Sequence, residues 1–422
     1  MKVLALDIGS SSAKAAIVVD GEIVGSVLRE PFRTDTQGVK VSVTAQELLR
    51  AAFAVLGAID GTGVDVLALT GMSPAWLAMG PNGKELSDII THADRRSVAQ
   101  AHAIEAALGR DDHLRRVGNR PFPGGISSTS CKWFADNHGM SGVDLVGHIT
   151  TLLHTSLTGA RVMDVSNAGF TGLWRVDGTG WDEELVDLVG LKMSQLPSVV
   201  DSGEVVGKLL PGASVVLKLP EGLPVTAGMV DGSGALLLAG ARPGQLVNSA
   251  GSTDVLAVCL DHPEPRADLL TRPLGIGRKW VSAATEAAAG STIAWARREL
   301  FRDLDDAAFE RLLTQTRSTD VAFDLRLAGS RTEIDQPTGG MSGLTLGSTR
   351  DDILGAIVAA LDRSRRERLA KLESLGTPLL DDVILTGGGA TPHPWTDRFN
   401  VRLEEEATLC GAALATQQGS AA

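Results

Sequence analysis

The sequence predicts a two-domain α/β protein in which each domain is a mixed β-sheet flanked by helices. Three observations support this fold class. The chain has 422 residues, which is more than one hydrophobic core usually supports. Apolar strands alternate with amphipathic helices along it. A pattern of strand, small-residue turn and strand occurs at residues 4–19 and again at 245–258, so we expect two similar halves with a cleft between them.

The first hairpin joins an acidic residue to a turn of small residues. Asp7 lies near the end of the first apolar strand, and Lys14 lies in the second. A carboxylate at a strand end can hold a divalent cation, and small turn residues expose N–H and hydroxyl donors to phosphate oxygens. A tight hairpin turn favours the same residues on conformational grounds alone, so both interpretations stay open here. The turn residues are Gly9, Ser10, Ser11 and Ser12.

Helices and strands alternate through the rest of the chain. Thr44 is a predicted N-cap, with Glu47 at the third helical position. Punctuation by Pro and Gly after Ala241 predicts a boundary, which divides the chain into domains at residues 1–241 and 242–422. The sequence predicts helices at 44–57 and 349–375, a mainly helical region at 97–160, and strands or extended segments at 64–70, 164–174, 223–227 and 382–386.

Bulk properties exclude several classes of function. The formal net charge of −12 argues against a nucleic-acid partner. No run of about 18 apolar residues occurs, so we expect no membrane span. The three cysteines have no Cys-x-x-Cys spacing and the eight histidines form no Cys/His cluster, which predicts no protein-held zinc. The start of the chain lacks a secretory signal, and we expect a cytoplasmic protein.

Six short motifs carry a family resemblance. They lie at residues 7–14, 70–83, 92–96, 227–232, 251–253 and 387–390. In this order and at these spacings they resemble the FGGY carbohydrate kinases of the actin-like ATPase superfamily, and the resemblance runs from end to end of the chain. His92 stands where the family's sugar motif usually has Trp.

The resemblance implies a fold and an activity. The fold would be two actin-like (ribonuclease H-like) domains, each a mixed sheet flanked by helices, with the sugar and phosphate site in the first and the nucleotide site in the second. The activity would be transfer of a phosphoryl group from ATP, with Mg²⁺, to a hydroxyl of a small sugar or polyol. A pentulose, a heptulose, an aldonate and a tetritol all stay open as acceptors, and a homodimer stays open as an assembly.

The resemblance also assigns roles to residues. Asp231 would be the catalytic base and a substrate contact, and Asp7 would hold Mg²⁺. Taken alone, these residues also allow other interpretations. They are an N-cap of a helix for Asp231, a core position for Trp76, and a surface salt bridge for Asp94 with Arg96. Phosphate contacts are assigned to Gly9, Ser10, Ser11, Ser12, Lys14, Gly251, Ser252 and Thr253, nucleotide contacts to Gly387, Gly388, Gly389 and Ala390, and sugar contacts to Trp76, His92, Asp94 and Arg96.

Other functions remain as alternatives. A non-catalytic sugar sensor on the same fold would predict loss of the base or of the metal carboxylate, yet Asp7 and Asp231 are both present. An actin-like ATPase that acts on protein partners is disfavoured by the sugar motif. The pair Gly275 and Gly277 is only part of a dinucleotide fingerprint, so we expect no NAD site.

Overall fold

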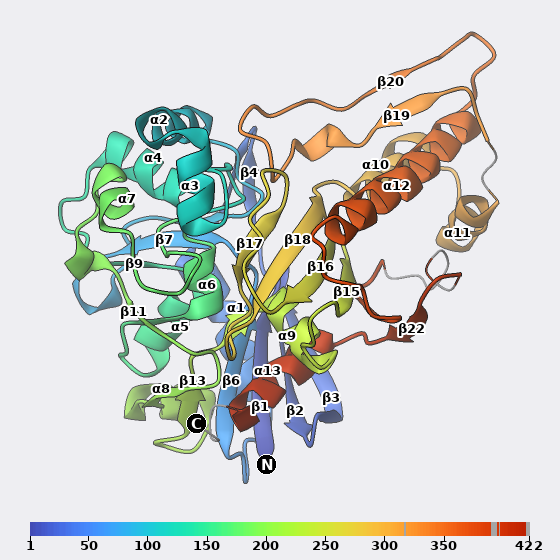
Figure 1. Cartoon of the computed structure of the whole chain (residues 1–422). Helices are drawn as coiled ribbons and strands as arrows, with labels where there is room; N and C mark the ends of the chain where they lie inside the picture. Colours follow the sequence, from blue (N-terminus) through green and yellow to red (C-terminus); the bar gives the residue numbers. More distant parts are fainter. Residues whose placement is uncertain (316–317, 390–394, 396, 419–422) are drawn as a thin grey trace.

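The computed structural model describes residues 1–315, 318–389, 395 and 397–418. Two mixed sheets form its centre, one in each half of the chain (Figure 1). Among the described residues, the N-terminal sheet has seven strands in the order β12-β13-β6-β1-β2-β3, with β14 also paired to β6. Its strands are β1 (Lys2–Ile8), β2 (Ser12–Val19), β3 (Glu22–Pro31), β6 (Val66–Gly71), β12 (Val205–Lys208), β13 (Pro224–Thr226) and β14 (Met229–Val230).

The C-terminal sheet repeats the central pattern of the first. Its described order is β17-β18-β16-β15-β21-β22. In each sheet a tight antiparallel hairpin, β1-β2 or β15-β16, is followed by a strand parallel to the hairpin's first strand, β6 or β21. This confirms the predicted repeat. The strands are β15 (Leu246–Ala250), β16 (Asp254–Leu260), β17 (Leu270–Pro273), β18 (Trp280–Glu286), β21 (Asp382–Thr386) and β22 (Asn400–Leu403).

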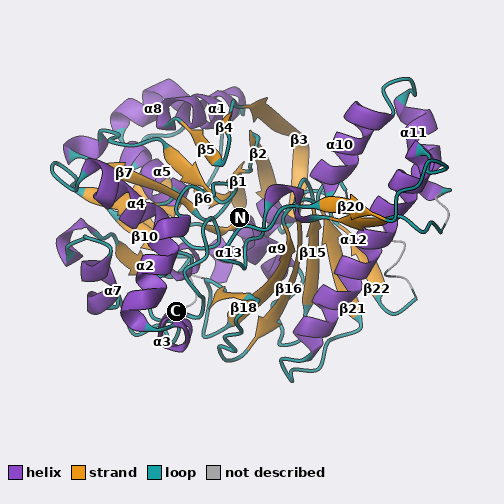
Figure 2. Cartoon of the chain, turned by 90° about the horizontal axis from the view of Figure 1, so that it is seen from above, coloured by secondary structure: helices purple, strands orange, loops and turns teal. Residues whose placement is uncertain are grey.

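Helices cover both faces of each sheet, as the view from above shows (Figure 2). Leu48 and Leu56 of α1 pack on one face of the N-terminal sheet, and Leu369 and Leu372 of α12 pack on one face of the C-terminal sheet. Thr44 caps α1 as predicted, because its side chain accepts a hydrogen bond from the backbone N–H of Glu47. The helices of these layers are α1 (Ala45–Ala58), α5 (Ile149–Leu157), α8 (Pro211–Leu217), α9 (Asp231–Leu238), α12 (Arg350–Glu373) and α13 (Ala407–Gln418).

Two helices of small residues lie between the sheets. Helix α13 packs on Val3 and Ala5 of the N-terminal sheet, and α9 packs on Val247 and Ala257 of the C-terminal sheet. The C-terminal helix therefore lies beside the first strand (Figure 1). The division at 241/242 stays a prediction, and it leaves each of these helices packed on the sheet of the other half.

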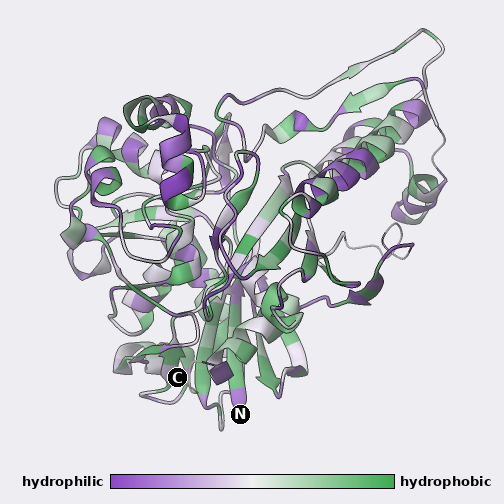
Figure 3. Ribbon diagram, viewed as in Figure 1, coloured by the Kyte–Doolittle hydropathy of each residue, from purple (hydrophilic) through white to green (hydrophobic). Residues whose placement is uncertain are grey.

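The remaining elements form two outer layers. Strands in Figure 3 are mostly hydrophobic, and the long helix α12 shows a hydrophilic outer side. On the N-terminal side lie β4 (Asp35–Gln37), β5 (Lys40–Val43), β7 (Ala75–Met79), β8 (Ile89–Thr91), β9 (Leu145–Gly147), β10 (Val162–Asp164), β11 (Ser198–Val200), α2 (Val98–Leu108), α3 (Arg110–Val117), α4 (Ser128–His138), α6 (Val165–Gly169) and α7 (Glu183–Leu188). On the C-terminal side lie α10 (Gly290–Leu300), α11 (Asp306–Thr314), β19 (Ala322–Asp324) and β20 (Gly340–Ser342).

One expected element is wrong. The extended segment predicted at residues 164–174 begins with a helix instead, α6, because the Asp164 side chain caps it by accepting from the backbone N–H of Asn167 at 3.0 Å. No helix among the described residues is both long enough and apolar enough to cross a lipid bilayer.

Candidate functional site

Asp7 and Asp231 come together at one edge of the N-terminal sheet. Strands β1 and β14 both run parallel to β6, and their last residues, Ile8 and Val230, both pair with Gly71. Parallel strands bring their carboxyl ends to the same edge of a sheet. Asp7 near the end of β1 and Asp231 just after β14 therefore lie on either side of β6. We call the edge at Asp7 and Asp231, together with the residues of the C-terminal half that pack against it, the junction.

Asp7 is a buried carboxylate with one unfilled oxygen. Its side chain is only 4% exposed, and Oδ2 accepts a hydrogen bond from the hydroxyl of Thr408 at 3.1 Å. Oδ1 has no partner among the described residues. Burial, and then the charge of Asp231, raises the pKa of Asp7 to about 6, and the nearby Lys14 opposes this rise.

The unfilled oxygen of Asp7 fits a role as a magnesium ligand. Burying a carboxylate without partners is costly, and a bound cation would remove that cost. No group of three or more His, Cys, Asp or Glu within the described part of the chain could hold a metal. A Mg²⁺ bound through Asp7 would therefore take most of its ligands from phosphate oxygens and water, as this cation usually does.

Asp231 is the first residue of helix α9. Its Oδ1 accepts from the backbone N–H of Gly232 at 2.7 Å, while Val230 occupies the N-cap position. Burial raises the pKa of the Asp231 carboxyl, and the charges of Arg272 and Arg331 act in the opposite direction. The side chain is a partly buried carboxylate with cations beyond ion-pair distance, an environment that tunes a carboxyl group for proton transfer.

The first predicted phosphate loop is a tight hairpin turn. The backbone N–H of Gly9 donates to the carbonyl of Ser12 at 3.0 Å, and Ser10 and Ser11 are exposed while Ser12 is buried. Lys14 on β2 does not lie free beside the turn, because its Nζ pairs with Glu406 at 2.8 Å.

The second predicted loop has the same geometry in the other domain. The N–H of Gly251 donates to the carbonyl of Thr253 at 2.8 Å, and Ser252 is exposed. The start of helix α10 rests on this turn, since the N–H of Ser291 donates to the carbonyl of Ser252 at 3.1 Å. The two hairpins therefore place equivalent small-residue turns in both domains.

The glycine loop after β21 lies directly beside the second phosphate loop. Gly387 has a φ of +92°, and a Cβ there would overlap the carbonyl oxygen of Ala250. Gly389 donates its N–H to the same oxygen at 2.9 Å. Gly387, Gly388 and Gly389 are exposed, so their backbone is open to a ligand. Ala390, also predicted to contact the nucleotide, lies outside the described residues.

The predicted sugar residues after β8 form a tightly bonded loop. The Asp94 carboxylate is buried and accepts from the N–H of Val41 at 2.6 Å and from the guanidinium of Arg96 at 2.7 Å. Asp94 and Arg96 therefore form the ion pair that was the alternative interpretation of these residues. The pair is buried and does not lie at the surface. Arg96 also lies over the ring of Trp133, 4.8 Å from its centroid.

His92 and Trp76 differ in how they are placed. The Nδ1 atom of His92 is buried without a partner among the described residues, and burial with the charges of Arg331 and Arg95 lowers the pKa of its ring to about 3. Trp76 is 3% exposed and packs on Phe134, with ring centroids 5.4 Å apart. A core position for Trp76, the alternative interpretation of the sequence, is thus what the structure shows.

Sequence reasoning missed two groups of residues at the junction. Thr408 and Glu406 come from the C-terminal end of the chain and contact Asp7 and Lys14. Their only sequence signal is the small-residue pattern of α13, which contains Thr408 and begins directly after Glu406. The second group consists of buried arginines.

Four arginines are buried in the described part of the chain, and only one has an acidic partner. Arg368 pairs with Asp254 at 2.7 Å. The other three, Arg95, Arg272 and Arg331, have no carboxylate oxygen of a described residue within 4.0 Å. Their spacing of more than 50 residues in the sequence gives no sign that they cluster.

Arg272 and Arg95 are held by neutral groups instead. The Nη1 atom of Arg272 donates to the hydroxyl of Ser233 at 2.6 Å, and the guanidinium lies over the ring of Phe170. Arg95 donates to the carbonyl of His92 at 2.7 Å. Burial lowers the pKa of each guanidinium to about 10, so both remain charged at neutral pH.

Comparisons with known proteins agree with this architecture. A family described as the FGGY family of carbohydrate kinases matches with its N-terminal domain over residues 2–237 and with its C-terminal domain over residues 246–417. Solved structures of xylulose kinase from Rhodospirillum rubrum (TM-score 0.86, 22% identity) and gluconate kinase from Lactobacillus acidophilus (TM-score 0.87, 18% identity) are similar in fold. These alignments cover 100% of this chain and 90% and 89% of the two structures.

Sequence relatives include enzymes with different acceptors. L-fuculokinase of Salmonella typhi is 25% identical over 288 residues, which is 63% of this chain but only 58% of that enzyme's length. Glycerol kinase of Pseudomonas entomophila is 27% identical over 425 residues, covering 92% of this chain and 80% of the enzyme.

Proposed function

Because the chain belongs to the FGGY family of carbohydrate kinases, we propose that it transfers the γ-phosphoryl group of ATP to a hydroxyl of a small sugar or polyol. The observation that carries the proposal is the position of Asp231. Its carboxylate lies at the junction, close enough to Asp7 for the charge of one to raise the pKa of the other. The small-residue turns at Gly9 and Gly251 provide phosphate contacts from the two domains.

The proposed reaction needs little covalent chemistry from the protein. An Asp231 oxygen accepts the proton of the acceptor hydroxyl, the hydroxyl oxygen attacks the γ-phosphorus, and the bond from that phosphorus to the β–γ bridging oxygen breaks. The products are a phosphate monoester, ADP and a proton held on Asp231. A Mg²⁺ bound at Asp7 would neutralise charge on the phosphates.

The C-terminal domain would supply the nucleotide contacts. Exposed backbone at Gly387, Gly388 and Gly389 allows close approach of adenine and ribose. On the acceptor side, His92, Asp94 and Arg96 form the loop proposed to face the sugar. Since the Asp94 oxygens already accept from protein donors, a sugar hydroxyl there would share or replace one of these hydrogen bonds.

The experiment is a coupled ADP-release assay with Asp231→Asn. Wild type is tested with a panel of pentuloses, heptuloses, aldonates and tetritols. The variant should lose at least about 100-fold in kcat, because general-base catalysis contributes 10²–10⁴-fold. ATP affinity, measured by calorimetry, should change little.

Asp306→Asn is the matched control. Asp306 is the first residue of α11, as Asp231 is of α9, but it is fully exposed and distant from the site in the fold. Full turnover by Asp231→Asn would refute the role of base. Absence of ADP release by wild type with every acceptor would refute the proposed kinase activity itself.

A further inference from the structure

A segment of the C-terminal domain, residues 329–336, reaches onto the N-terminal domain. We call it the strap. The Arg95 guanidinium donates to the side chain of Gln336 at 3.0 Å, and His102 contacts Asp335 at 2.7 Å. Ile334 is buried in an apolar cluster that contains Val230, the residue before the proposed base. The strap therefore lies at the junction.

Arg331 is the charged residue that the strap brings to this place. Its side chain is 7% exposed, and its guanidinium makes one hydrogen bond within the described part of the chain, from Nη2 to the carbonyl of Ser73 at 3.2 Å. Nε is buried without a partner. A buried guanidinium usually has an anion beside it, and the buried Arg368 has Asp254 in that role.

The groups around Arg331 leave this charge without a contacting anion. The neighbouring Arg95 is also a cation without a close carboxylate, and both lower the pKa of His92. His92 is therefore neutral near pH 7, and its Nδ1 has no partner among the described residues. Asp231 is the acidic group whose charge acts on Arg331, but no oxygen of Asp231 lies within ion-pair distance.

Arg331 lies beside the loop proposed to face the sugar. The groups assigned to phosphate and metal are Asp7 and Lys14, and their charges couple to Asp231. The charge of Arg331 couples to Asp231 and to His92. The contacts of the strap place Arg331 beside that loop: its Nη2 donates to the carbonyl of Ser73, and Gln336 accepts from Arg95 in the loop that carries His92.

We propose that the acceptor is a sugar acid and that Arg331 binds its carboxylate. This inference rests on the proposed kinase function and narrows its substrate class. Guanidinium and carboxylate form strong, charge-assisted hydrogen bonds. A carboxylate on the acceptor supplies the anion that Arg331 lacks, whereas a neutral polyol of the same length leaves the buried charge unpaired.

The test compares aldonates with alditols of equal chain length, from four to six carbons. Binding to the full chain is measured by calorimetry, with and without ADP. The aldonate should bind at least about tenfold more tightly than its alditol, because hydrogen bonds to charged groups contribute more than neutral ones. Arg331→Met should abolish this preference, and Arg331→Lys should retain part of it because it keeps the charge but loses the planar fork.

Arg326→Met is the matched control. Arg326 precedes the strap by a few residues but is exposed and pairs with Asp324 at 2.6 Å, so its replacement should leave the aldonate preference unchanged. Circular dichroism and melting curves establish that each variant is folded. If Arg331→Met does not fold, the partial preference expected for Arg331→Lys decides the question.

Three results would overturn the inference. The first is equal or tighter binding of the alditols, which leaves the kinase proposal intact if neutral acceptors are phosphorylated. The second is no binding of either class, in which case ADP release alone decides the kinase proposal. The third is an Arg331→Met variant that binds ADP or an ATP analogue more weakly but keeps the aldonate preference, because the arginine would then serve the phosphates.

Discussion

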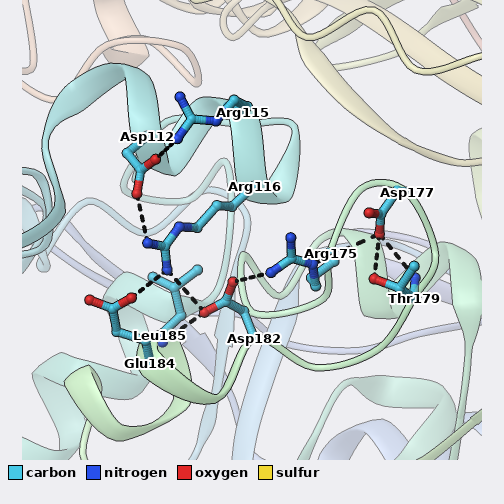
Figure 4. Close-up of polar contacts among 9 residues, drawn as sticks. All are labelled: Asp112, Arg115, Arg116, Arg175, Asp177, Thr179, Asp182, Glu184 and Leu185. Atoms are coloured by element: carbon cyan, nitrogen blue, oxygen red, sulfur yellow. Dashed lines mark hydrogen bonds and ion pairs between the residues drawn. The ribbon is translucent and has the colours of Figure 1, made fainter.

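The arginines of the junction and those of the outer N-terminal layer use their charges differently. Between α3 and α7, Arg116 pairs with Glu184 at 2.6 Å and with Asp112 at 2.8 Å, and Arg175 pairs with Asp182 at 3.0 Å (Figure 4). At the junction, Arg272 and Arg331 are more deeply buried and have no described carboxylate within 4.0 Å.

This difference distinguishes arginines whose charges stabilise the fold from arginines whose charges are available to bind a ligand. In the outer network each guanidinium is compensated by the protein itself, so its replacement affects stability. A buried guanidinium without an acidic partner costs free energy in the folded state, and a bound anion can recover that cost. The variants below test this division by measuring stability and turnover together.

The largest contrast is expected between two buried arginines. Arg368→Met leaves Asp254 without its partner and should lower the free energy of unfolding by about 3 kcal/mol. Arg272→Met removes a charge that has no close carboxylate, so stability should change by no more than about 1 kcal/mol. Its kcat/KM should fall about 100-fold, because the charge acts on the proposed base.

Urea unfolding and the ADP-release assay give both quantities for these variants. Greater destabilisation by Arg272→Met than by Arg368→Met would contradict the division between structural and ligand-directed charges.

Asp7→Asn should stabilise the protein while preventing transfer. The pKa of Asp7 is about 6 in the folded chain and near 3.8 when unfolded, so the folded state binds more protons between these values. The free energy of unfolding contributed by Asp7 therefore falls as the pH rises from about 4 to 6 and stays low above 6. Asparagine removes this loss, a gain of up to about 3 kcal/mol at pH 7.

The measurement is urea unfolding of wild type and Asp7→Asn at pH 4.5 and pH 7.5 without Mg²⁺. The gain should be larger at pH 7.5. A variant that is less stable than wild type at both pH values would show that Asp7 is a structural carboxylate.

The smallest effect is expected for the paired carboxylate of the outer network. Asp182 accepts from Arg175 and caps α7 by accepting from the backbone N–H of Leu185 at 3.2 Å (Figure 4). Asp182→Ala should lower the free energy of unfolding by about 1–2 kcal/mol through loss of the cap and the ion pairs.

Turnover of Asp182→Ala at a temperature well below its melting point should equal that of wild type. A loss of kcat without a loss of stability would remove the distinction between the two regions.

Local patterns were enough to predict the elements near the site. These elements are the hairpins at Asp7 and Gly251, the cap at Thr44 and the strand before Gly387. Each depends on residues that are close together in the sequence, so local sequence patterns predict it. The helix after Asp164 differs from the prediction because it is only Val165–Gly169, and Ser166, Asn167 and Gly169 are weak helix formers, which leaves the Asp164 cap as its main local signal. The roles of the predicted contact residues remain predictions.

The two repeated hairpins, the family and the two carboxylates Asp7 and Asp231 follow from the amino-acid sequence without the fold. Packing alone brings Thr408 to Asp7, and Arg331 to Ser73 beside the loop that carries His92. The physical reason is that hairpins and caps are made by hydrogen bonds between near neighbours. The charge around a buried group depends instead on segments hundreds of residues away, and only packing brings these together.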